Sequence, residues 1–331
     1  MAIPQRTALT LPDPRGVEPT IEMAKWAEGE GYDDLWFADS SGVDALTTAA
    51  AVAMNTSRCR IGTAIIPVFS RTPAVLASTA HVLHQLSGGR FILGLGSSSQ
   101  TMMENWHGQT FEKPLTRVKE TVQLVRSMLA GEKSDFAGQT VSSRGYRQLP
   151  LEAGAQPIYM AALRERMLEA AAEHSDGVIL NLFPRDALPK MMDHIRIGAE
   201  RAGKKLEDVE VVCRHQVIVT DDIEDARNRI RGAFAPYYAT PVYNAFLAWS
   251  GYEDVAATIR EGWAAKDREK TTGALSDQLV DDIAIIGDIG ACQDRIREYA
   301  EGGITTHIIS CVSPKDTQAT YGAFTGNAFT F

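Results

Sequence analysis

Residues 59–99 read CRIGTAIIPVFSRTPAVLASTAHVLHQLSGGRFILGLGSSS, and this stretch decides the fold. The apolar run at residues 61–68 predicts a strand. Thr72 can accept a hydrogen bond from the first turn of a following helix, and Pro73 fits the first helical position because no N–H bond is lost there. The glycine pair at residues 88–89 predicts the end of that helix.

A second strand follows this helix. The apolar residues 91–95 open directly into the small residues 96–99. Because a helix crosses between the two strands, we expect them to be parallel and to end at the same edge of a sheet, where ligand sites lie. The crossover helix has apolar residues at i, i+3, i+4 and i+7 spacing. We expect it to bury Leu76, Thr79, Ala80, Leu83 and Leu86.

Strands and helices alternate along nearly the whole chain. Eight of each in this order are typical of a (β/α)8 barrel, although an open doubly wound sheet gives similar local signals. The length of 331 residues favours the barrel, as a single domain over residues 1–331. The predicted strands are residues 7–11, 34–38, 59–66, 91–95, 157–161, 177–181, 209–219 and 307–310. The predicted helices are residues 18–30, 44–54, 73–86, 114–130, 164–174, 185–202, 223–237 and 291–301.

Two stretches interrupt the alternation. Residues 131–156 predict a small hairpin outside the barrel. Residues 239–282 predict an insertion between strands seven and eight, with a helical pattern at 252–266. Insertions at this edge of a barrel form lids or substrate walls. Residues 281–288 predict a short extra strand before the last helix.

The composition excludes several classes of protein. A net charge of −9 argues against non-specific binding to nucleic acid or an anionic membrane. The four cysteines are scattered without metal-ligand or disulfide spacing, so no metal site is expected. GxSxG, HExxH and Walker motifs are absent, which removes support for hydrolysis and phosphoryl transfer. No apolar run has the length of a leader or membrane span, so we expect a cytoplasmic protein.

Polar residues at the predicted strand ends are the candidate catalytic residues. Asp39 and Ser40 follow the second strand, and a carboxylate there either serves the site or caps the next helix. His215 lies within the long seventh strand. It meets substrate if it points inward and packs under helices if it points outward, and the sequence leaves this parity open.

The turn after the fifth strand is the candidate anion site. Ala162, Leu163, Arg164 and Glu165 lie between that strand and a helix. A helix N-terminus offers free N–H groups and partial positive charge to an anion, and Arg164 adds charge. An ordinary barrel helix would begin in the same way.

The segments GTAIIP, RTPA and LSGGRFILGLG resemble the bacterial-luciferase-like flavin and deazaflavin oxidoreductases. They are most similar to the branch that uses coenzyme F420, which includes methylenetetrahydromethanopterin reductase. The similarity extends from AEGEGYDDLWFAD near the start to GDIGACQDRIREYAEGGITTHII near the end. It implies a (β/α)8 barrel, often dimeric, that transfers a hydride at C5 of the deazaflavin. The alternatives are an FMN-dependent monooxygenase on the same barrel and a cofactor-binding homologue without turnover.

The resemblance also implies roles for individual residues. Asp39 would lie beside the reacting ring, and Ala64 and Ile65 would form a bulge with a non-proline cis peptide behind it. Ser97 and Ser98 would lie along the edge of the ring.

At the turn after the fifth strand, the resemblance implies that the backbone of residues 162–165 holds the coenzyme phosphate. Relatives usually carry glycine at the positions of Leu163 and Arg164, so a side-chain contact from Arg164 would substitute for close backbone approach.

Two departures from the family pattern bear on the chemistry. Several F420 branches carry histidine at the position of Ser40, and serine is a poor base near pH 7. Ser99 stands where several relatives have an acidic residue. The missing histidine favours reduction of an activated C=C, C=N or methylene donor over alcohol oxidation. The expected partners are a small organic substrate and a second copy of the chain.

Overall fold

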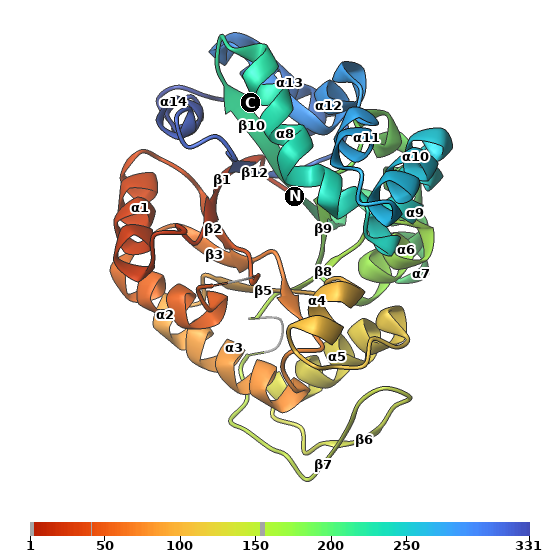
Figure 1. Cartoon of the computed structure of the whole chain (residues 1–331). Helices are drawn as coiled ribbons and strands as arrows, with labels where there is room; N and C mark the ends of the chain where they lie inside the picture. Colours follow the sequence, from red (N-terminus) through yellow and green to blue (C-terminus); the bar gives the residue numbers. More distant parts are fainter. Residues whose placement is uncertain (1–2, 41, 153–155) are drawn as a thin grey trace.

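Parallel strands close into a barrel in the computed structural model, which describes residues 3–40, 42–152 and 156–331 (Figure 1). The barrel strands are β1 (Arg6–Leu11), β2 (Asp34–Phe37), β3 (Arg60–Thr63) continued by β4 (Ile66–Pro67), β5 (Phe91–Gly96), β8 (Ile158–Ala161), β9 (Gly177–Asn181), β10 (Glu210–Val219) and β12 (Thr306–Ser310). Their order is β10-β12-β1-β2-β3-β5-β8-β9, and β9 also pairs with β10, which closes the ring. The predicted (β/α)8 barrel is therefore confirmed over the doubly wound sheet.

Helices surround the barrel, as Figure 1 shows. Each helix predicted from the sequence is present, with ends shifted by a few residues at most. They are α1 (Val17–Gly29), α2 (Ala45–Asn55), α3 (Pro73–Ser87), α5 (Pro114–Leu129), α6 (Glu165–His174), α7 (Leu188–Arg201), α8 (Ile223–Tyr238) and α13 (Ile289–Glu301). A short helix, α14 (Thr317–Gly322), follows β12.

Helix α3 shows how local sequence sets these boundaries. The Thr72 hydroxyl accepts a hydrogen bond from the Val75 N–H, and Gly88 ends the helix in the left-handed conformation with φ of 62°. The prediction that Leu86 is buried is wrong, because that side chain is 38% exposed. In the last turn of the helix, Ser87 is buried instead of Leu86. The Ser87 hydroxyl accepts a hydrogen bond from the Phe91 N–H at 3.1 Å.

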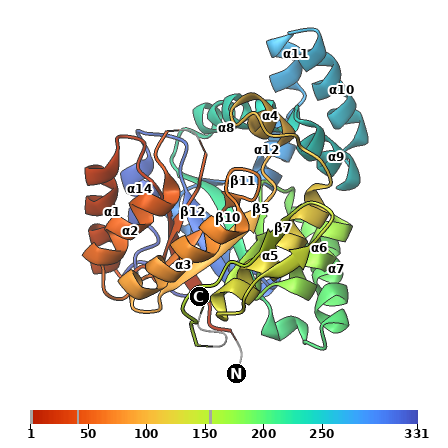
Figure 2. The same cartoon turned by 90° about the horizontal axis from the view of Figure 1, so that it is seen from below.

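The two interruptions also adopt regular structure. Strands β6 (Asp135–Ala137) and β7 (Ser142–Arg144) form the expected antiparallel hairpin. The later stretch folds into helices α9 (Pro241–Trp249), α10 (Glu253–Ala264), α11 (Arg268–Gly273) and α12 (Asp277–Ile283). The predicted extra strand is present as β11 (Ala284–Gly287), and it pairs in parallel with β10. Figure 2 shows α9 to α11 together with α4 (Gln100–Asn105) at the end of the barrel opposite the N-terminus.

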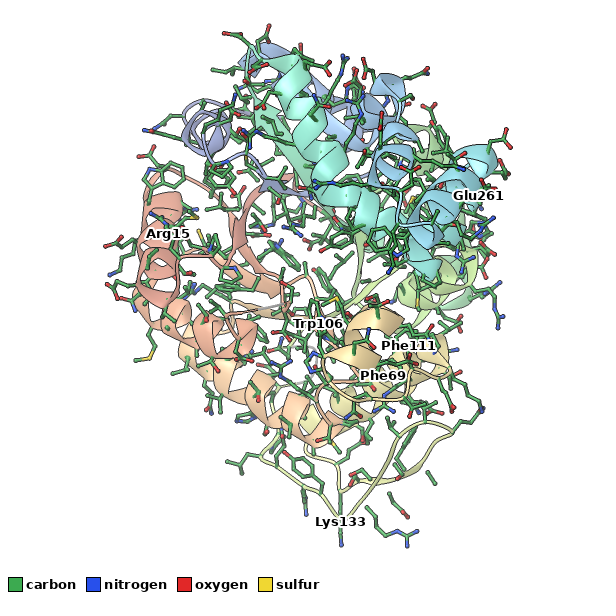
Figure 3. All side chains as sticks on the ribbon, in the orientation of Figure 1. Arg15, Phe69, Trp106, Phe111, Lys133 and Glu261 are labelled. Carbon is green, nitrogen blue, oxygen red and sulfur yellow. The ribbon has the colours of Figure 1, made fainter. Side chains whose placement is uncertain are left out.

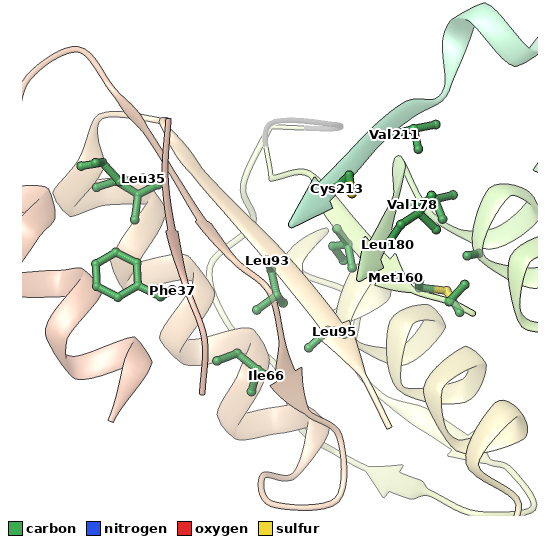
Figure 4. Packing of buried hydrophobic residues seen from close by; sticks show 14 of the residues in the cluster. Leu35, Phe37, Ile66, Leu93, Leu95, Met160, Val178, Leu180, Val211 and Cys213 are labelled. Carbon is green, nitrogen blue, oxygen red and sulfur yellow. The ribbon is translucent and has the colours of Figure 1, made fainter. Parts of the chain in front are cut away.

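Along each strand, side chains point alternately into the barrel and outward toward the helices. Inside, a separate cluster forms around Trp36, and a Cβ atom at Gly62 would lie only 2.5 Å from its ring. Glycine is therefore required at position 62 to accommodate the indole. Outside, side chains such as Leu93, Leu180 and Cys213 lie between the strands and the helices (Figure 4). The interior cluster consists of Ala8, Trp36, Ile92, Tyr159, Ile179, Val212 and Ile308.

A buried ion network closes the N-terminal end of the barrel. The Arg60 guanidinium lies 2.5 Å from Asp34 and 2.7 Å from Glu210, and these carboxylates are 0% and 7% exposed. Hydroxyls of Tyr159 and Thr306 each donate to Glu210 at 2.6 Å. Burial raises the pKa of Glu210, but its hydrogen bonds with Arg60, Thr306 and Tyr159 outweigh this and hold it below the ordinary value. The network joins β2, β3, β8, β10 and β12.

We predict that Arg60→Met destabilises the protein strongly, because it leaves the buried Glu210 without its cation and Asp34 with only the more distant Arg6, at 3.6 Å. Removing one partner of a buried ion pair costs about 3–5 kcal/mol. The free energy of unfolding from urea denaturation checks this. As a control, Arg144→Gln removes an exposed pair with Asp135 and costs under about 1 kcal/mol. Equal losses in both variants would contradict a structural role for the Arg60 network.

Candidate active site

Most of the predicted site residues lie along one arc of the barrel rim. Asp39 follows β2, residues 64–65 separate β3 from β4, residues 97–98 follow β5, and residues 162–165 follow β8. These strands are consecutive neighbours in the sheet, and their C-terminal ends point the same way. The arc is therefore continuous, as expected for a site at the C-terminal end of a barrel.

The bulge predicted at Ala64 and Ile65 is present. Between their paired positions with β5, the β3–β4 segment contains one more residue than β5 does. The peptide bond between Ala64 and Ile65 is cis, which confirms the expectation. Both side chains are partly buried against the apolar interior cluster. They present a small apolar surface at the barrel mouth.

Asp39 is held by an arginine, Arg71, that no sequence motif marks as a site residue. Its carboxylate lies 2.5 Å from the Arg71 guanidinium and accepts a 3.3 Å hydrogen bond from the Ala45 N–H. Arg71 also pairs with Asp44, whose side chain caps α2 by accepting from the Thr47 N–H. Burial lowers the pKa of Arg71, but these two carboxylates raise it above its ordinary value. Asp39 thus closes the loop before α2 and also faces the rim.

A polar hollow of about 290 Å³ lies beside this ion pair. Asp39, Ser40, Ser70, Arg71 and His107 contribute to its wall. Ser40 is exposed there, so it can reach a bound molecule without displacing protein contacts.

An aromatic stack supports the neighbouring loop. The rings of Phe69 and Phe111 lie 4.8 Å apart, and the Arg117 guanidinium lies 4.6 Å from the Phe69 ring. Figure 3 shows Phe69 and Phe111 together, with Trp106 on the nearby segment after α4. Trp106 is 56% exposed. In the segment between β5 and α5, Phe111 is therefore packed against Phe69, whereas Trp106 is exposed to solvent.

The serine loop after β5 combines an unusual backbone with a helix cap. Ser98 has φ of 60°, a conformation that is uncommon outside glycine and recurs at functional sites. The Ser99 hydroxyl accepts from the Met102 N–H at 3.3 Å and caps α4. Ser97 and Ser98 remain half-buried at the rim. The hydroxyl of Ser99 is therefore engaged in capping α4.

The turn into α6 corrects one of the predicted phosphate contacts. The Ala162 N–H donates to the Ile179 carbonyl at 3.0 Å within the sheet, so it has no free donor for an anion. Arg164 is exposed at the N-cap, and its carbonyl accepts from the Met167 and Leu168 N–H groups at 2.9 Å, which leaves the N–H groups of residues 165 and 166 as the donors for an anion. The Glu165 carboxylate has one buried oxygen without a hydrogen-bond partner among the described residues. Leu163, Arg164 and Glu165 thus remain candidates for anion binding, whereas the Ala162 amide does not.

His215 does not join this arc. It lies on the outer face of β10, 4% exposed, with its ring 4.6 Å from that of Tyr299 on α13. Its Nε2 lies 3.1 Å from Nδ1 of His307. Burial lowers the pKa of His215 well below its ordinary value and that of His307 to about 3. The outward parity removes His215 from the candidate catalytic residues, and its neighbour Arg214 faces inward instead.

We predict that this histidine pair makes the protein sensitive to acid. Below about pH 6.5 the unfolded chain protonates both rings while the folded chain keeps them neutral, so stability falls as pH falls. Each histidine contributes up to about 1.4 kcal/mol per pH unit between its folded and unfolded pKa values. His215→Gln should therefore reduce the slope of unfolding free energy against pH between about pH 4 and 6.

Urea denaturation at each pH gives this slope. His107→Gln is the matched control, because His107 is exposed on a loop. If His215→Gln and His107→Gln have the same slope as the parent protein, the histidine pair is not the source of acid sensitivity.

In residues 3–40, 42–152 and 156–331, no helix combines the length and the apolarity needed to span a membrane. Among the same residues, no three histidine, cysteine, aspartate or glutamate side chains gather closely enough to hold a metal ion.

Comparisons with known proteins give consistent findings. A family model described as luciferase-like monooxygenase matches residues 1–306. A 5,10-methylenetetrahydromethanopterin reductase of Methanolobus tindarius is 32% identical over 294 residues, which cover 87% of this chain and 89% of the relative. A putative coenzyme F420-dependent oxidoreductase of Mycobacterium tuberculosis is 28% identical over 318 residues, covering 90% and 92%. The solved structure of a coenzyme F420-dependent tetrahydromethanopterin reductase from Methanopyrus kandleri has a TM-score of 0.80 at 21% identity, covers 97% of each chain and shares the fold.

Proposed function

The chain belongs to the luciferase-like monooxygenase family, and from this we propose that it is a coenzyme F420-dependent oxidoreductase. The reaction is a hydride transfer between C5 of the deazaflavin and a small organic substrate. The observation that carries the proposal is the continuous rim arc, in which the Ala64–Ile65 bulge stands between Asp39 and the serine loop. The names of two similar proteins, from M. tuberculosis and M. kandleri, support F420 as the coenzyme.

The residues of the arc fit the parts of such a coenzyme. Ala64 and Ile65 offer an apolar surface for a flat ring, and Asp39 lies beside it in a fixed position. The hydroxyls of Ser97 and Ser98 can donate to or accept from polar atoms at the ring edge. When bound, the deazaflavin supplies a carbon that accepts or releases hydride, and the protein supplies orientation and electrostatics.

The start of α6 is proposed to hold the coenzyme phosphate. The N–H groups of residues 165 and 166 can donate to an anion at the helix N-terminus, and the exposed Arg164 adds a positive charge. Glu165 opposes this, because its carboxylate competes with an anion for the same positive end of the helix. Leu163 contributes backbone only.

The proposed direction is reduction of the substrate. Alcohol oxidation needs a base near the hydroxyl, and Ser40 is a poor one. Ser99 caps α4 and His215 lies outside the barrel, so neither provides that base. Reduction of an activated C=C, C=N or methylene group places less demand on the protein, because its first step is hydride delivery.

Paired fluorescence titrations with coenzyme F420 and FMN test the proposed function. We expect saturable binding of F420 at least about tenfold tighter than that of FMN, a difference of about 1.4 kcal/mol. Tighter binding of FMN than of F420 would contradict the proposal and support an FMN-dependent monooxygenase. If the protein binds F420 but reduces no substrate tested, the result would support the alternative that it is a cofactor-binding homologue without turnover.

Asp39→Asn and Ser40→Ala form a matched pair for this titration, because the two residues are adjacent at the rim. Asp39→Asn removes the charge that holds Arg71, and we expect it to weaken F420 binding by about tenfold or more. Ser40→Ala should leave F420 affinity nearly unchanged and slow turnover only modestly. A large loss of affinity from Ser40→Ala with none from Asp39→Asn would contradict the assignment.

The exposed faces of α2 and α3 support the proposal of a homodimer. Met54, Val75, Val82 and Leu86 are 71%, 48%, 51% and 38% exposed. Val75, Val82 and Leu86 have i, i+7, i+11 spacing and so share one face of α3. Exposed apolar faces on soluble proteins commonly mark protein–protein contacts, and two copies would bury the same face symmetrically.

Val82→Lys tests this surface with light scattering. We expect a dimer mass for the parent protein and a shift toward monomer in the variant, because a buried lysine is costly. A monomer mass for the parent protein would contradict the proposal.

A further inference from the structure

Four polar side chains line the barrel interior on the side opposite the rim arc. Asn181 lies at the end of β9, Arg214 and Gln216 lie on β10, and Ser310 ends β12. Asn181 pairs with Arg214 in the sheet and Ser310 pairs with Gln216. Since neighbouring strands lie about 4.8 Å apart, the four side chains form one compact patch.

The parity of β10 gives the direction in which this patch points. Val212 belongs to the interior cluster, whereas Cys213 lies outside beneath the helices (Figure 4). Side chains alternate along a strand, so Arg214 and Gln216 share the inward face with Val212. Ile308 is also interior, which places Ser310 on the same face of β12. A hydrogen bond of 3.0 Å from Arg214 Nη2 to Ser310 Oγ agrees with this.

Several polar atoms of the patch have no hydrogen-bond partner among the residues that the structure describes. Gln216 is only 2% exposed, yet neither its Oε1 nor its Nε2 is hydrogen-bonded within the part of the chain that the structure describes. The same holds for Arg214 Nε and Asn181 Oδ1. Buried polar groups are nearly always paired, and leaving one unpaired is destabilising. A cluster of such atoms at a barrel mouth is therefore suited to receive a ligand.

The charge of the patch defines the chemistry of that ligand. Arg60 and Arg71 each contact two carboxylates, but no carboxylate of the described residues pairs with Arg214. The ionisable groups that act on Arg214 are three tyrosines, Tyr237, Tyr243 and Tyr321. Burial raises the pKa of Tyr243 to about 12, so it stays neutral. A guanidinium in these surroundings is stabilised by an anion that comes from outside the chain.

We propose that Asn181, Arg214, Gln216 and Ser310 bind an anionic oxygen group of the substrate, such as a carboxylate. Arg214 would donate from its planar fork, and the Gln216 amide and Ser310 hydroxyl would donate beside it. Tyr243 of α9 accepts from Asn181 Nδ2 at 3.3 Å, so the inserted helices close over this subsite. The inference rests on the proposed function, because it assigns the rim arc to the coenzyme and this patch to the substrate.

Calorimetric titration of the F420-loaded protein with matched carboxylates and amides tests the subsite. The probes are benzoate against benzamide, and acetate against acetamide. We expect each carboxylate to bind at least about tenfold more tightly than its amide, because only the carboxylate pairs with Arg214. Arg214→Gln should abolish this preference, and Arg214→Lys should retain part of it. The exposed Arg144→Gln is the control and should leave the preference unchanged.

Gln216→Leu provides a second readout that a purely structural role would not give. Replacing an unpaired buried amide with an apolar side chain should raise the melting temperature of the unliganded protein and weaken carboxylate binding. This variant also tests the subsite if Arg214→Gln does not fold.

Three results would overturn the proposal. Equal binding of carboxylates and amides by the parent protein would exclude an anion subsite. An unchanged preference in folded Arg214→Gln and Gln216→Leu would place the anion elsewhere. Loss of F420 affinity in Arg214→Gln, with the carboxylate preference intact, would assign the patch to the coenzyme. If the parent protein does not bind F420, the proposed function fails, and the same titrations without coenzyme still decide the subsite.

Discussion

The ion network around Arg60 is the constraint on which the rest of the barrel depends. It brings a guanidinium, two carboxylates and two hydroxyls together at the N-terminal ends of five strands. Buried charges are tolerated only when their partners are well placed, so the network favours a single register of these strands. Above it the interior is apolar, with Trp36 packed against the space that Gly62 leaves free. The network thereby fixes the positions of the strands whose C-terminal ends carry the polar groups at the opposite end of the barrel.

The open end divides into two halves of different character. The arc from β2 to β8 combines an apolar bulge, a small-residue loop and a helix N-terminus, which suits a flat ring joined to a phosphate. The half formed by β9, β10 and β12 carries Arg214, and among the described residues the Gln216 amide and Asn181 Oδ1 have no hydrogen-bond partner, which suits an anionic partner. The proposed hydride transfer requires two reactants held in contact with fixed orientation, and the two proposed sites, adjacent on one barrel, would meet this requirement. The helices α9 to α11 and α4 lie at this same end.

Much of this arrangement follows from local sequence. Helix α3 begins and ends where its cap residues predict, and the bulge with its cis peptide lies where the family resemblance places it. The errors concern features that local sequence does not determine. The segment VVCRHQVIV of β10 has no polar alternation, so the outward direction of His215 could not be read from it. The Ala162 N–H is not available to an anion, because it donates to the Ile179 carbonyl. Only formation of the sheet brings these two groups together, so local sequence does not indicate the pairing.

Arg71 and Leu86 show two further limits. The contact between Arg71 and Asp39 joins two loops 32 residues apart in sequence, and only the closed barrel brings them together. Leu86 fits an apolar helical stripe but is exposed in the single chain, where a second copy is proposed to cover it. Predicting the contacts of residues at the rim and on the protein surface thus requires the tertiary structure, whereas predicting the strands and helices does not.

The measurement that tests the central claim most directly is a crystal structure of the protein with coenzyme F420. We predict electron density for the deazaflavin ring against Ala64 and Ile65, with Asp39 beside it and the phosphate at the N-terminus of α6. The face of the ring toward Arg214 should remain open to substrate. A ring bound outside the rim arc, or a phosphate held by Arg214 instead of α6, would contradict the assignment of the two halves.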